Sequence, residues 1–97
     1  MNETTQLHRQ AMEQYDFALL ARTNGDGDAS ARHMQSAFSL ESKAANSLVD
    51  SLEAEPTRSV LFRSAATLAR DCKRYADAED LIGKAFEGSP PPKSPRS

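Results

Sequence analysis

Apolar residues recur every three or four positions along most of this chain, which is the spacing of amphipathic α-helices. Four segments show the pattern, at about residues 4–23, 29–54, 57–71 and 75–87. Short polar stretches separate them, so each helix is expected to fold back against the one before it. The pattern therefore predicts an all-α protein in which four antiparallel helices form two stacked helical hairpins.

The expected ends of the helices follow from residues that favour turns and caps. Asn24-Gly25 tolerates left-handed backbone angles and is expected to end the first helix, with Asp28 as the N-cap of the second. No glycine or proline interrupts residues 29–54, so the second helix is expected to be long, roughly 37 Å at 1.5 Å per residue. Pro56 should end it and lie in the first turn of the third helix.

The composition predicts a small domain with a thin core. Of the 97 residues, 15 are alanine and four are phenylalanine, and tryptophan is absent. Small side chains let helices approach closely, but each buries little area. We expect one helical domain over residues 1–88 and a flexible tail, rich in proline and serine, over residues 89–97.

Charge and hydropathy argue against several classes of partner. The 12 basic and 14 acidic side chains give a net charge of -2 and are mixed along the chain, so no basic face for nucleic acid is expected. No apolar run approaches the roughly 18 residues of a membrane span, and no signal sequence opens the chain. Together with the single cysteine, these features favour a cytoplasmic protein that binds neither nucleic acid nor membrane.

Residues 59–92 carry small and large side chains at regular positions. A bulky aromatic residue precedes two small ones, and the next helix has a small, a large and a small residue before a closing proline. These positions are Phe62, Ala65, Ala66, Ala78, Ile82, Ala85 and Pro90. The spacing resembles the tetratricopeptide repeat, a helix-turn-helix unit of 34 residues. The resemblance implies that the last two helices touch at Ala66 and Ala78, although Ala69 stands where the family has a tyrosine.

The first hairpin matches the repeat more weakly. Its small and large positions fall on Ser30, Met34 and Ala37, but no proline follows, and the helix is expected to continue to Ala54. The run at residues 55–69 is also similar to segments of small uncharacterised bacterial helical-repeat proteins, which implies no particular activity. The resemblance therefore implies a tetratricopeptide-like fold with one irregular and one regular repeat.

The acidic turn between the first two helices invites interpretation as a calcium loop. Asn24, Asp26 and Asp28 alternate as calcium ligands do. The loop would next need a glycine, where Ala29 stands, and a closing glutamate, where Gln35 stands. We therefore interpret the segment as a turn whose glycine and aspartate residues serve backbone geometry and N-capping.

The histidines and the cysteine show no arrangement for metal binding or catalysis. His8 and His33 lie on different expected helices, with no cysteine or carboxylate at a metal-ligand spacing. Cys72 has Arg70 and Arg74 nearby, cations that would lower the pKa of a thiol, but no histidine follows at a useful spacing. We expect no catalytic residue, no cofactor and no metal.

Two surfaces are candidates for binding a protein. In the third helix Arg63 and Arg70 are seven residues apart and project the same way, with Thr67 between them. Members of the repeat family that grip a partner's terminal carboxylate use lysine, asparagine and arginine on this face, but Thr67 stands where the asparagine would be. In the fourth helix Ile82 and Phe86 form a second apolar line that no later helix covers. We expect it to bind a second copy or an amphipathic helix of another protein.

These observations favour a non-catalytic module for protein–protein interaction. One alternative is a small helical enzyme or ligand carrier with a pocket between the hairpins, which would need convergent polar groups on faces that carry mainly alanine, leucine and phenylalanine. Another alternative is a truncated product of a longer repeat protein, which would explain the absence of a capping helix.

Overall fold

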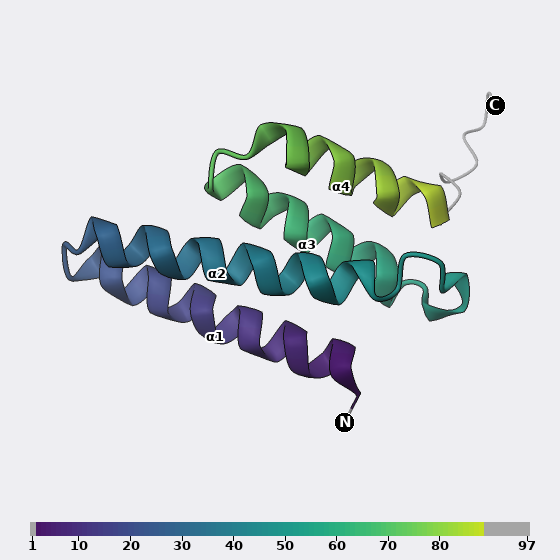
Figure 1. Ribbon diagram of the computed structural model, residues 1–97, viewed down its shortest axis with the longest axis horizontal. Coiled ribbons are helices and arrows are strands. Elements are labelled where there is room, and N and C mark those ends of the chain that lie inside the picture. Colours follow the sequence, from purple (N-terminus) through teal and green to yellow (C-terminus); the bar gives the residue numbers. More distant parts are fainter. Residues whose placement is uncertain (1, 89–97) are drawn as a thin grey trace.

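Four antiparallel α-helices make up the fold in the computed structural model, which describes residues 2–88. They are α1 (Glu3–Thr23), α2 (Gly27–Asn46), α3 (Thr57–Asp71) and α4 (Tyr75–Gly88), with a short 3₁₀ helix, η1 (Leu52–Ala54), before α3. Each helix packs on the next one along the chain, so that α1 and α2 form one hairpin and α3 and α4 form the other (Figure 1). The predicted all-α fold with two stacked hairpins is confirmed. The predicted flexible tail, residues 89–97, lies outside the described residues.

The turn between α1 and α2 forms where the sequence predicts it. Gly25 has a φ of +79°, the left-handed conformation that glycine adopts without strain. The prediction that Asp28 caps α2 is wrong, because the turn is complete one residue after Gly25. Asp26 is therefore the N-cap, and its side chain accepts a hydrogen bond of 3.1 Å from the backbone N–H of Ala29.

The second helix is shorter than predicted, because α2 ends at Asn46 rather than at Ala54. Side chains near this end bond to the backbone of the last turn: Ser47 Oγ donates to the Ala44 carbonyl and Asn46 Nδ2 donates to the Ser42 carbonyl. Such local bonds compete with continued helix. The chain then passes through turns and η1 before it enters α3.

The core is built mainly from small side chains, as the composition predicts. Nine of the 15 buried apolar residues in the described part of the chain are alanines. Phe38, Leu61, Phe62 and Leu81 supply much of the remaining volume. Ala66 is buried in α3 and Ala78 is partly buried in α4, and their mutual contact stays a prediction.

A cluster of polar side chains that the sequence analysis missed lies where η1 meets α3 and α4. Arg58 is 1% exposed; its Nε donates to the Val49 carbonyl at 2.9 Å, and its guanidinium lies 5.0 Å from the centre of the Phe62 ring. Ser59 Oγ lies 2.8 Å from a Glu55 carboxylate oxygen and 3.2 Å from the Ala85 carbonyl. The cluster ties the segment before α3 to the last turns of α4.

We expect this cluster to make stability depend on acid pH through Glu55. Burial raises the pKa of the Glu55 carboxyl, but hydrogen bonds from Ser59 and the charge of Arg58 together hold that pKa below its ordinary value. A lowered folded-state pKa gives stability that is present above the ordinary value of about 4.3 and is lost as pH falls through the folded value. In urea unfolding at about pH 6 and about pH 2.5, the wild type should lose more stability on acidification than Glu55→Gln. Equal losses would contradict this assignment.

Candidate functional site

One flank of α4 faces α2 across a cleft. Asp77 and Lys84 line this cleft of about 220 Å³ together with Phe38 and Ser42 of α2. At one end of the cleft the Arg74 guanidinium lies 5.0 Å from the centre of the Phe38 ring. This flank of α4 is therefore turned toward the rest of the domain.

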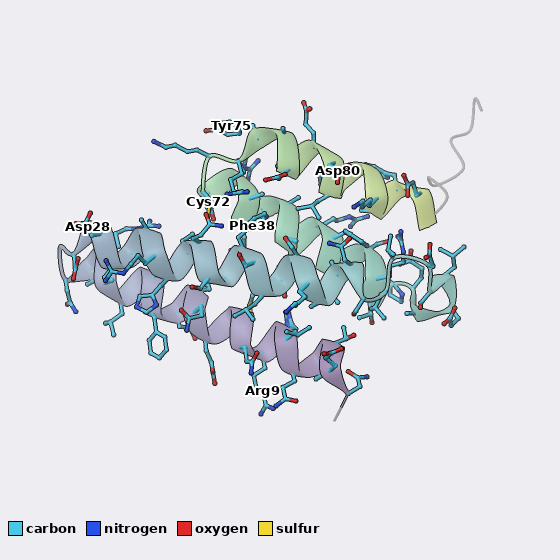
Figure 2. The ribbon with its side chains drawn as sticks, viewed as in Figure 1. Arg9, Asp28, Phe38, Cys72, Tyr75 and Asp80 are labelled. Carbon is cyan, nitrogen blue, oxygen red and sulfur yellow. The ribbon has the colours of Figure 1, made fainter. Side chains whose placement is uncertain are left out.

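The opposite flank of α4 is apolar and exposed. Tyr75, Ile82 and Phe86 are 60%, 37% and 54% exposed, and their spacing of seven and four residues places them on one line along the helix. Ile82 precedes Lys84 by two residues, which is about 200° around a helix, so this line faces away from α2. Figure 2 shows Tyr75 at the start of α4, on the outside of the molecule.

Two arginines of α3 border this apolar line. Ser59 marks the side of α3 next to α4, because its hydroxyl approaches the Ala85 carbonyl. Arg70 and Arg63 lie about 20° and 40° around α3 from Ser59, and both are exposed. Since α2 packs against α3 and lines a cleft on the opposite flank of α4, the exposed side of α3 and the apolar line of α4 face the same way.

The structure thus places four of the five predicted binding residues on this surface, which we name the α3–α4 face, and the fifth, Thr67, at its border with α1. Arg63 and Arg70 come from α3, and Ile82 and Phe86 come from α4. The sequence analysis missed a further member of the face, Tyr75. The signal was present, because Tyr75 precedes Ile82 by seven residues and therefore shares its side of the helix.

A second surface feature is a groove between the hairpins, and its lining has no charged side chains and no thiol. It has a volume of about 220 Å³ and is lined by Met12 and Tyr15 of α1 and by Ser64, Thr67 and Leu68 of α3. Thr67 Oγ1 already donates to the Arg63 carbonyl within α3, at 3.1 Å. The lining residues include no carboxylate, imidazole, ammonium or thiol that would act as an acid, a base or a nucleophile.

The pKa of the Cys72 thiol is raised, whereas the sequence led us to expect a lowered value. Burial raises its pKa, the Asp71 carboxylate raises it further, and Arg74 offsets these effects in part. The expected lowering by nearby cations is therefore wrong, because Cys72 is partly buried and an acidic residue precedes it. A thiol with a raised pKa is a weak nucleophile at neutral pH.

Both histidines bond within the helical hairpin of α1 and α2. His8 Nδ1 donates to both carboxylate oxygens of Glu41, at 2.8 and 3.0 Å. His33 Nδ1 donates to the Gln14 amide oxygen at 2.8 Å, and its ring lies 5.5 Å from the Phe17 ring. Among the described residues, no three His, Cys, Asp or Glu side chains gather where a metal ion would bind.

Comparisons with known proteins add no relative. The chain matches no protein-family model, no curated protein and no solved structure. Its tetratricopeptide-like character therefore stays a prediction from the spacing in residues 59–92. None of the helices within residues 2–88 is both long enough and apolar enough to span a membrane.

Proposed function

We propose that this chain is a non-catalytic protein-interaction module of the tetratricopeptide-like kind, and that the α3–α4 face is its binding surface. The observation that carries the proposal is the exposure of Phe86, which lies more than half in solvent on the same side of α4 as Ile82 and Tyr75. Burial of such apolar surface is favourable by about 25 cal/mol per Å². A single exposed apolar residue is ordinary, but three on the same side of one helix are typical of an interaction site.

The composition of the face supports the same conclusion. Aromatic residues and arginine are enriched in protein interfaces, and they dominate the binding energy where they are buried on association. The α3–α4 face combines Tyr75 and Phe86 with Arg63 and Arg70. The groove between α1 and α3, which an enzyme or ligand carrier would use, has no comparable set of functional side chains.

The proposal is tested by affinity capture with the intact chain and two variants. Phe86→Glu places a charge on the apolar line of the α3–α4 face, whereas Leu20→Glu places the same charge at an exposed apolar position of α1. We expect proteins from the source cells, or added untagged chain, to be retained by the wild type and by Leu20→Glu. Retention by Phe86→Glu should fall about tenfold or more, the loss typical when an aromatic residue that anchors an interface is replaced. An identical set of retained proteins on all three baits would contradict the proposal.

A further inference from the structure

The outer edge of α4 is acidic. Glu79 and Glu87 lie about 40° and 120° around the helix from Tyr75, both on the side away from the buried residue Leu81. Both glutamates are exposed. The apolar line of α4 therefore runs between a basic row on α3, formed by Arg63 and Arg70, and an acidic row on its own helix. Within residues 2–88, none of these four charged side chains makes an ion pair.

This order of basic, apolar and acidic rows is complementary to itself. A two-fold axis that runs parallel to α4, in the plane of the face, lays one apolar line on the other and exchanges the two charged rows. The arginines of each copy then lie opposite the glutamates of its partner. A two-fold axis perpendicular to α4 would instead place arginines opposite arginines, which is repulsive.

We therefore propose that the occupant of the α3–α4 face is a second copy of this chain, docked with its α4 parallel to the first. The inference rests on the proposed function, because it names the partner of the same surface. The apolar line supplies the affinity, and the charged rows select the orientation and exclude unmatched partners.

Charge-reversal variants distinguish self-association through this face from binding of a different protein. One variant carries Arg63→Glu and Arg70→Glu, so that both of its rows are acidic, and the other carries Glu79→Arg and Glu87→Arg, so that both of its rows are basic. All four positions are exposed, so both variants should keep the helical circular dichroism spectrum and the melting temperature of the wild type.

Sedimentation over a roughly hundredfold concentration range gives the result. The wild type and Leu20→Glu should dimerise as concentration rises. Each charge variant alone should need about tenfold more protein, and their equimolar mixture should dimerise as readily as the wild type, because every row then meets its opposite.

Two outcomes would overturn the inference. One is a mixture that associates no better than the separate variants, and the other is a wild-type chain that stays monomeric throughout the range. In the second case, loss of other captured proteins with Phe86→Glu would still support the proposed function. Retention of the same proteins by Phe86→Glu would remove both proposals together.

Discussion

Replacing Arg58 by alanine should lower the free energy of unfolding by about 2 to 4 kcal/mol, a large share of the stability of a domain this small. The side chain is almost fully buried and touches three parts of the fold. Its Nε satisfies the Val49 carbonyl, its guanidinium lies over the Phe62 ring, and Nη1 lies 3.5 Å from Glu55. Truncation removes these contacts and leaves a space between the segment before α3 and the core.

Two further substitutions of Arg58 distinguish the contribution of its packing to stability from the contribution of its charge. Arg58→Met keeps most of the buried volume against Phe62 and should cost less than alanine. Arg58→Lys keeps the charge but loses the planar donors that reach both Val49 and Glu55, so it should also destabilise. Urea unfolding with circular dichroism measures all three variants. An alanine variant within about 0.5 kcal/mol of the wild type would show that the cluster does not hold this end of the fold.

Replacing His8 by alanine should cost about 1 to 3 kcal/mol, although His8 is 42% exposed, because its partner is fully buried. Glu41 is 0% exposed, and within the described residues both of its carboxylate oxygens bond to His8 Nδ1 alone. Without the imidazole, a buried carboxylate loses its hydrogen-bond donor. The loss of stability therefore arises mainly at Glu41, although the substituted residue is His8.

A substitution of the partner, Glu41, should have a different effect on stability from His8→Ala. Glu41→Leu replaces the buried carboxylate by an apolar side chain and leaves His8 to be hydrated, so it should be near neutral or stabilising. In the double variant, His8→Ala should then cost little, which gives a coupling energy of about 1 kcal/mol or more in a double-mutant cycle. Thermal unfolding in which His8→Ala has the same effect with either residue at position 41 would contradict this account.

The sequence predicts the helices well where local signals act alone. Pro56 and the turn before Tyr75 bracket α3, and the predicted range of residues 57–71 is the observed one. The prediction fails after Asn46, where no proline or glycine marks the end of α2. Local side-chain bonds of Asn46 and Ser47 occur at that end, and the Val49 carbonyl just beyond it accepts a bond from Arg58 of the next helix. A pattern of apolar positions contains no information about such a bond.

The candidate binding face was predictable in its parts but not as a whole. Helical spacing alone places Ile82 with Phe86, and Arg63 with Arg70. That the two pairs share one surface depends on α2, which packs against α3 and lines the Lys84 flank of α4, leaving the opposite sides of both helices exposed. The basic and acidic rows on either side of the apolar line become apparent once these orientations are known.

Ile82 offers the most direct test of the α3–α4 face as the binding surface. It is the only isoleucine in the chain, so selective methyl labelling gives one NMR signal from the middle of the face. Labelled methionine methyls provide a matched reference, because Met12 lines the groove between α1 and α3. Our account predicts that raising the protein concentration, or adding a captured partner, shifts or broadens the Ile82 signal and leaves Met12 unchanged. A signal from Met12 that moves while Ile82 stays constant would contradict it.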